Sequence, residues 1–233
     1  MEVRCYEIMN RIEKSYWWSR GRRRIVKNII KGPNPKILDI GCGSGALLEE
    51  LTKIGDAVGV DSSSLAIEFC REKNLQVKMG DATKLPFLDK TFDYVLSLDV
   101  LEHIEDDGKA VSEMKRVLKD SGSAIIMVPM FNWLWCKADK TAHHFRRYNK
   151  KRLCELMDSN NLLVTRFTYF NTLLFLPIML IKKIINPVSE VDIKLGFLNQ
   201  ILHIIYSFET TLLRYVNFPL GVSSLIIARK NSE

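Results

Sequence analysis

The residues best suited to chemistry form a glycine-rich turn directly after an apolar run. Residues 37–45 read Ile-Leu-Asp-Ile-Gly-Cys-Gly-Ser-Gly, so Asp39 precedes a turn that contains Gly41, Gly43 and Gly45. Glycine tolerates positive φ and leaves the backbone bare, so a flat nucleoside can lie against such a turn at the mouth of the following helix. The segment predicts a nucleoside-binding turn, although it also satisfies the dinucleotide fingerprint G-x-G-x-x-G/A.

Acidic residues at the ends of neighbouring apolar runs discriminate between the two kinds of nucleoside. Asp39, Asp61, Asp81 and Asp99 each lie at or beside the end of such a run. In an open parallel sheet the carboxyl ends of the strands border one crevice, where ligands bind. A rim of carboxylates repels a pyrophosphate but attracts a ligand that carries a sulfonium and an ammonium group. We therefore expect S-adenosylmethionine in this crevice rather than a dinucleotide.

These segments, together with Gly-Val-Asp at 59–61, Gly-Asp-Ala at 80–82 and Ser-Leu-Asp-Val-Leu-Glu-His at 97–103, resemble the class I S-adenosylmethionine-dependent methyltransferases of the small-molecule type 11/12 group. The resemblance runs from about Tyr6 to the end of the chain. It implies an α/β fold with a Rossmann-like, doubly wound, seven-stranded sheet of order 3-2-1-4-5-7-6, whose last strand is antiparallel. N-terminal helices would precede this sheet.

The same resemblance implies which residues hold S-adenosylmethionine and release S-adenosylhomocysteine. Asp39 and the three glycines would hold the methionine end, and Asp61 would accept hydrogen bonds from the ribose hydroxyls. An N-terminal helix would close over the cofactor and bind its carboxylate. The other residues expected at the cofactor are Ser62, Asp81, Ala82, Leu98, Trp18 and Arg23.

Two further clusters carry groups that could act on the acceptor of the methyl group. Methyl transfer from a sulfonium requires positioning, desolvation and, for some nucleophiles, removal of a proton. The candidate catalytic residues are His144, Tyr148 and His103, and the candidate substrate-binding residues are Asp99, Arg147 and Trp133. Histidine side chains commonly act as bases in enzymes, so His144 is a candidate base, and Arg147 is a candidate anchor for a phosphate or carboxylate.

Each cluster also has a plainer interpretation. His103 could orient a loop, and residues 139–148 could form a solvated basic loop. No metal site is expected, because the adjacent His143 and His144 lack cysteine or acidic partners at ligand spacing.

The chain of 233 residues is 47% hydrophobic and reads as one methyltransferase domain with additions. We expect an N-terminal helical lid (1–32), a cofactor-binding core (33–170), a hydrophobic helical insertion (171–220) and a last strand with a tail (221–233). Apolar runs predict strands at 36–40, 57–60, 76–79, 92–98, 124–128, 162–169 and 223–229. The residues between them predict helices at 11–30, 44–53, 62–72, 107–118 and 150–160, the last capped by Asn149.

The insertion consists of two apolar pieces. Residues 173–181 are apolar, contain Pro177 and are followed by two lysines, so this piece is too short to span a bilayer. Residues 198–216 have the spacing of an amphipathic helix. These helices could cover the core or a homodimer seam, or could form a hydrophobic lid or membrane-surface platform beside the site. We favour the second interpretation slightly.

The bulk properties favour an anionic partner without choosing among lipid, nucleic acid and acidic substrate, because the net charge is +7. Five scattered cysteines fit a reducing, cytoplasmic location, at the inner face of the membrane if the platform interpretation holds. We expect a methyltransferase for a small, amphiphilic or lipid-linked acceptor. A nucleic-acid methyltransferase is a minor alternative because an Asn/Asp-Pro-Pro-Tyr motif is missing after the fourth strand, and a non-catalytic cofactor-binding or membrane scaffold is the third hypothesis.

Overall fold

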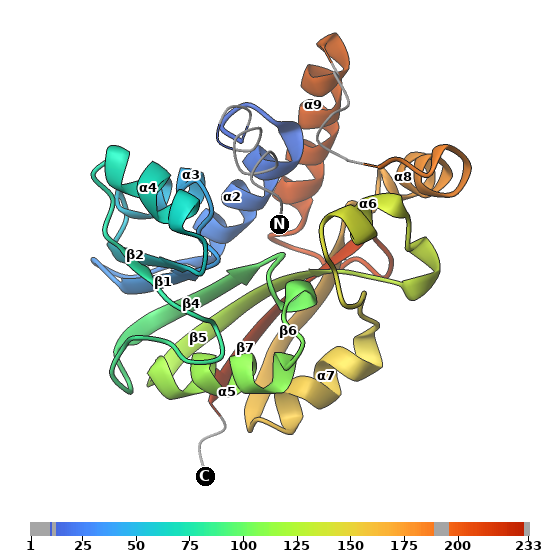
Figure 1. The fold of residues 1–233 in the computed structure, drawn as a ribbon. Helices are drawn as coiled ribbons and strands as arrows, with labels where there is room; N and C mark the ends of the chain where they lie inside the picture. Colours follow the sequence, from blue (N-terminus) through green and yellow to red (C-terminus); the bar gives the residue numbers. More distant parts are fainter. Residues whose placement is uncertain (1–9, 11–12, 189–195, 231–233) are drawn as a thin grey trace.

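The computed structural model describes residues 10, 13–188 and 196–230. These residues form one seven-stranded sheet of order β3-β2-β1-β4-β5-β7-β6 (Figure 1). Strand β7 pairs antiparallel with β5 and β6, and the remaining pairs are parallel. The predicted fold class is therefore confirmed. The strands are β1 (Lys36–Ile40), β2 (Asp56–Asp61), β3 (Val77–Met79), β4 (Phe92–Leu98), β5 (Leu118–Pro129), β6 (Leu162–Phe170) and β7 (Ser223–Lys230).

Helices cover both faces of the sheet and bury its central strands on both sides. Helices α5 (Asp107–Val117) and α7 (Lys150–Asp158) pack on one face. The other face is covered by α2 (Trp17–Ile29), α3 (Ala46–Leu51), α4 (Ser64–Glu72) and α9 (Phe197–Leu212). This two-sided burial explains why the central strands are continuous apolar runs rather than alternating ones.

The described part of the segment between β6 and β7 contains helices, one of which lies beside α2. It contains α8 (Phe175–Leu180), a π-helix η3 (Ile181–Ile185) and α9. Helices α2 and α9 pack side by side (Figure 1), with the ring centroids of Trp17 and Tyr206 5.4 Å apart. A Cβ atom on Gly21 would lie 1.9 Å from the Tyr206 ring, so only glycine permits this close approach.

Three short helices complete the described structure. They are η1 (Leu101–His103), η2 (Asn132–Leu134) and α6 (Lys137–Thr141), and all three follow the carboxyl ends of β4 or β5. Within the described ranges, no helix combines the length and the apolar character that crossing a membrane requires. The division of the chain into lid, core, insertion and tail stays a prediction.

Candidate active site

A cavity of about 1190 Å³ opens at the carboxyl ends of the strands. All four predicted acids, Asp39, Asp61, Asp81 and Asp99, line it. The strand order explains this convergence, because β1 lies between β2 and β4 and the parallel strands end at the same edge. A site of this size exceeds the usual range for one drug-sized ligand, so two small molecules can lie in it together.

The glycine turn forms the floor of the cavity, and its conformation requires glycine. Gly41 and Gly43 both have positive φ, 67° and 54°. A Cβ atom on Gly41 would lie 2.5 Å from Val100, whereas one on Gly43 would meet no atom within 4 Å. Gly43 therefore leaves open space above bare backbone, as a nucleoside needs. Gly45, also predicted at the cofactor, instead precedes α3 and faces Cys70 and Leu75, outside the cavity lining.

Asp39 is a buried carboxyl that lines the cavity. It is 3% exposed, and none of the described residues forms a hydrogen bond or ion pair with it. Burial, followed by the nearby charge of Glu13, raises the pKa of Asp39 well above its usual range. A cation in the cavity would reverse this effect, so the environment of Asp39 fits an ammonium ligand.

Asp61 is held rigidly where β2 ends. Its carboxylate accepts hydrogen bonds from the backbone N–H groups of Gly43 and Ser63, both at 2.9 Å, which lock the glycine turn onto β2. Asp81 accepts from the backbone and hydroxyl of Thr83, and these hydrogen bonds lower the pKa of Asp81. The remaining residues predicted beside the cofactor, Ser62, Ala82 and Leu98, also line the cavity.

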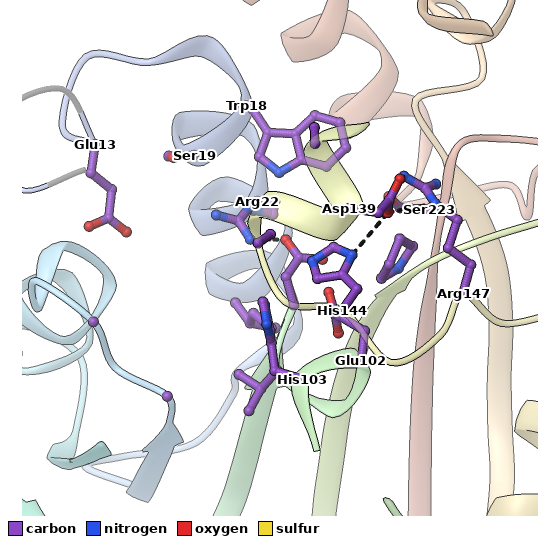
Figure 2. Close-up of a pocket in the computed structure, with 18 of the residues that line it drawn as sticks. Glu13, Trp18, Ser19, Arg22, Glu102, His103, Asp139, His144, Arg147 and Ser223 are labelled. Atoms are coloured by element: carbon purple, nitrogen blue, oxygen red, sulfur yellow. Dashed lines mark hydrogen bonds and ion pairs between the residues drawn. The ribbon is translucent and has the colours of Figure 1, made fainter. Parts of the chain in front are cut away.

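Helix α2 closes one side of the cavity with Trp18 and Arg22 (Figure 2). Arg22 forms an ion pair with Asp99, which has an unusual φ of 54° directly after β4. The predicted Arg23 also borders the cavity, but its guanidinium binds Glu50 at 2.7 Å and the backbone carbonyls of Glu13 and Lys14. The structure thus commits Arg23 to holding α2 in place, and Arg22 is the arginine near the strand-end acids.

A buried chain of charged groups orients His144. The Nδ1 atom of His144 lies 2.9 Å from a carboxylate oxygen of Asp139 (Figure 2). Arg147 binds both oxygens of that carboxylate, at 2.8 and 3.0 Å, and is 4% exposed. Burial alone would raise the pKa of Asp139, but the hydrogen bond from His144 and the charge of Arg147 outweigh it and lower the pKa.

This arrangement corrects the predicted role of Arg147. Its donors are engaged by Asp139 and by the Met130 carbonyl, so it positions Asp139 instead of anchoring a substrate anion. His144 keeps its Nε2 atom for another partner, because Nδ1–H donates to Asp139.

Glu102 and His103 belong to η1, and both lie close to His144 (Figure 2). The rings of His103 and His144 are 4.6 Å apart, centroid to centroid. Burial and the neighbouring His144 lower the pKa of His103 to about 4, so this ring is neutral at physiological pH. Burial, with the nearby Asp99, raises the pKa of Glu102 well above its usual range.

Besides Gly45, two predicted site residues lie outside the cavity lining. Tyr148 is 1% exposed, and its hydroxyl lies 2.8 Å from an Asp107 oxygen and 3.2 Å from the Leu101 carbonyl. It links η1 to α5 and does not reach the cavity, which corrects its prediction as a catalytic group. Trp133 is 47% exposed and packs against Phe131 and Phe175, so its prediction as a substrate-binding residue is also corrected.

Another wall of the cavity comes from the segment between β6 and β7 and is mostly apolar, although Lys182 also lines it. Its cavity-lining side chains include Leu174, Ile178, Ile181, Leu198 and Leu202. One cavity thus joins a polar, acid-rimmed floor to a hydrophobic wall.

Sequence reasoning missed four residues around the cavity: Glu13, Arg22, Glu102 and Asp139. Arg22 could have been found, because it follows Trp18 by one helical turn and therefore shares its face. Asp139 and Glu102 gave no comparable signal, since only the fold brings them to His144.

The comparisons with known proteins agree with this geometry. Residues 38–126 match the family described as a methyltransferase domain. A demethylmenaquinone methyltransferase from Staphylococcus aureus is 33% identical over 131 residues, which are 52% of this chain and 54% of the relative. The chain therefore spans about half the length of the curated relatives it matches.

Solved structures share the fold over nearly the whole chain. A SAM-dependent methyltransferase from Thermotoga maritima has a TM-score of 0.64 at 20% identity, covering 98% of this chain and 96% of that one. Another from Archaeoglobus fulgidus has a TM-score of 0.61 at 21% identity, covering 91% and 93%. At these identities the likeness establishes the fold.

Proposed function

We propose that this chain, which carries a class I S-adenosylmethionine-dependent methyltransferase domain, methylates a small acceptor that is amphiphilic or lipid-linked. The domain match and the fold confirm the predicted enzyme class and S-adenosylmethionine as the methyl donor. The observation that carries the proposal for the acceptor is the composition of this cavity, which combines strand-end acids with a mostly apolar wall. An acceptor with a polar reacting end and a hydrophobic body fits both.

The cofactor-binding roles follow from the environments of the residues. We assign the ammonium end of the cofactor to Asp39, the ribose hydroxyls to Asp61 and the space above Gly43 to the nucleoside. Asp81, Ala82, Ser62 and Leu98 would border the adenine. Trp18 would cover the cofactor from α2.

Methyl transfer from S-adenosylmethionine requires the protein mainly to position the reactants and to remove a proton. S-Adenosylmethionine supplies a methyl group that is already activated by the positive sulfur. Nε2 of His144 would accept the proton that the acceptor atom loses as it gains the methyl group, and Asp139 would stabilise the resulting imidazolium. The apolar wall excludes water from the reacting atoms.

The curated relative offers an example of an acceptor of this kind. Its name gives demethylmenaquinone as its substrate. We infer an acceptor of comparable amphiphilic character here, reached at the cytoplasmic face of a membrane. Exposed apolar side chains of η3 and α9, such as Ile184 at 76% and Phe197 at 75%, support this placement. The apolar wall gives no support to the nucleic-acid alternative.

Transfer of a labelled methyl group tests the proposal. The purified chain is incubated with methyl-labelled S-adenosylmethionine and, separately, with the lipid, aqueous small-molecule and nucleic-acid fractions of a cell extract. Label entering the lipid fraction is the expected result. Label in nucleic acid alone would contradict the proposed acceptor, and S-adenosylmethionine binding without transfer into any fraction would favour the scaffold hypothesis.

A further inference from the structure

We propose that Glu102, His103 and His144 bind one divalent transition-metal ion, such as Zn²⁺, in the wall of the cavity. Each residue offers one ligand atom, and these atoms lie within 4.8 Å of one another. Figure 2 shows the two rings and the carboxylate gathered at one point of the cavity. A bound metal would occupy Nε2 of His144, so the proposed role of that atom as a base applies to the metal-free protein. The metal site itself does not depend on the identity of the acceptor.

The backbone holds the two ligand-bearing segments together. Glu102 and His103 lie on η1, directly after β4, whereas His144 lies in the loop after α6. The backbone N–H of Phe145 donates to the carbonyl of Glu102 at 2.8 Å, and the N–H of His144 donates to the carbonyl of Asp139 at 2.9 Å. The three ligands therefore rest on a fixed scaffold, as metal sites require.

His144 has the outer-shell partner that metal-bound imidazoles have. Asp139 lies on Nδ1 of His144, at 2.9 Å, and is itself held by Arg147. A carboxylate or carbonyl on one ring nitrogen fixes the tautomer and leaves the lone pair of the other nitrogen for a metal.

Glu102 supplies an independent observation, an unpartnered oxygen. It is 1% exposed, and its Oε2 atom has no hydrogen-bond partner among the described residues. The neighbouring carboxylates Asp99 and Asp139 form ion pairs with Arg22 and Arg147. Glu102 forms no ion pair with any of the described residues. Because a buried carboxylate without a partner is costly, a bound cation would resolve this imbalance.

The ligand set selects the class of metal. Two imidazole nitrogens and one carboxylate suit Zn²⁺ and its first-row neighbours, whereas Mg²⁺ and Ca²⁺ prefer all-oxygen sites. Three protein ligands also leave an open coordination position, as in catalytic zinc sites. In this chain that position would face the cavity.

Metal titration of the whole chain, purified without a histidine tag and stripped with a chelator, tests the proposal. Calorimetry with Zn²⁺ should give one site per chain. Glu102→Gln and His144→Gln should each weaken binding at least tenfold, and Asp139→Asn should weaken it by about 10- to 100-fold through His144. His143→Asn is the matched control, because His143 is exposed and its positive φ of 58° suits asparagine.

Three results would overturn the site. They are an affinity for Zn²⁺ unchanged in Glu102→Gln and His144→Gln, binding of Mg²⁺ in preference to Zn²⁺, and sulfur ligands in the X-ray absorption spectrum of the Zn²⁺ complex. The last would move the ion to cysteines such as Cys42 and Cys70, whose Sγ atoms are 3.9 Å apart. Circular dichroism and S-adenosylmethionine affinity of each variant separate loss of the site from loss of the fold.

Discussion

The pKa values of two buried carboxyls at the same cavity, Asp39 and Asp139, are shifted in opposite directions. Burial, followed by the nearby charge of Glu13, raises the pKa of Asp39. The pKa of Asp139 is lowered, because His144 and Arg147 together outweigh the effect of burial. The environment of Asp39 suits a carboxyl that becomes charged when a cationic ligand binds. The environment of Asp139 suits a carboxylate that is charged at all times and orients a histidine.

The raised pKa of Asp39 predicts that Asp39→Asn stabilises the ligand-free protein while weakening cofactor binding. As pH rises above about 4, the unfolded chain loses the Asp39 proton before the folded chain does. Wild type therefore loses up to about 1.4 kcal/mol of stability per pH unit, until the folded pKa is reached, and the variant does not. Denaturant unfolding between pH 4 and 7 should show a growing advantage for the variant.

Cofactor affinity supplies the second measurement on the same variant. Loss of a charge-assisted hydrogen bond is worth about 1.5–3 kcal/mol, so S-adenosylmethionine should bind at least tenfold more weakly.

Asp139→Asn should have the opposite effect on stability. Its free energy of unfolding should be lower than that of wild type at neutral pH, and this deficit should shrink as pH falls below about 4. Equal pH profiles for both variants would contradict the assignment.

The orientation of His144 predicts a specific kinetic defect. His144→Gln should lower turnover by about 10²- to 10⁴-fold with unchanged cofactor affinity, because the variant lacks the proposed base. His143→Asn should retain wild-type turnover. Steady-state rates, with S-adenosylmethionine affinity measured separately, would reveal a merely structural role as parallel losses of both.

At the scale of elements, the sequence indicated most strands but not how the helices close the cavity. The strand Phe92–Leu98 has the predicted bounds, and Asn149 caps α7 by accepting from the N–H of Arg152. These features follow from local apolar runs and capping chemistry. The π-helix Ile181–Ile185 and the position of Glu102 beside His144 depend on packing between segments far apart in the chain, which local patterns do not encode.

The contact between α2 and α9 gives a prediction about Gly21. Alanine normally stabilises a helix by about 1 kcal/mol relative to glycine. Here its Cβ would lie 1.9 Å from Tyr206, so overpacking should dominate and Gly21→Ala should lower the unfolding free energy by about 1–3 kcal/mol. Chemical denaturation measures the change.

A double-mutant cycle supplies the control for this contact. In a Tyr206→Leu background the same Gly21→Ala change should cost less, or even stabilise, because the ring is gone. An equal cost in both backgrounds would mean that the Tyr206 ring does not set the requirement for glycine.

At the scale of the whole molecule, the chain combines two exposed apolar stripes with a positive net charge. Along α9 the exposed residues Phe197, Ile201, Ile204 and Phe208 recur at helical spacing. Along α8 and η3, Leu176, Leu180 and Ile184 do the same. The sequence indicated amphipathic helices here, but it could not reveal that these stripes stay uncovered by the rest of the described fold while neighbouring side chains line the cavity.

Vesicle binding tests whether these stripes meet a membrane surface. With a net charge of +7, the chain should sediment with anionic vesicles at low salt and bind more weakly as salt rises. Because a fully buried large apolar side chain contributes about 1.5–3 kcal/mol, the pair Ile184→Gln and Phe208→Gln should reduce binding at least tenfold. Leu88→Gln is the matched control, since Leu88 is 84% exposed on the loop before β4.

Equal binding by the control and the double variant would exclude the stripes as the contact. A wild-type chain that ignores the vesicles yet measures as a dimer by light scattering, with a monomeric double variant, would instead assign the stripes to a homodimer seam.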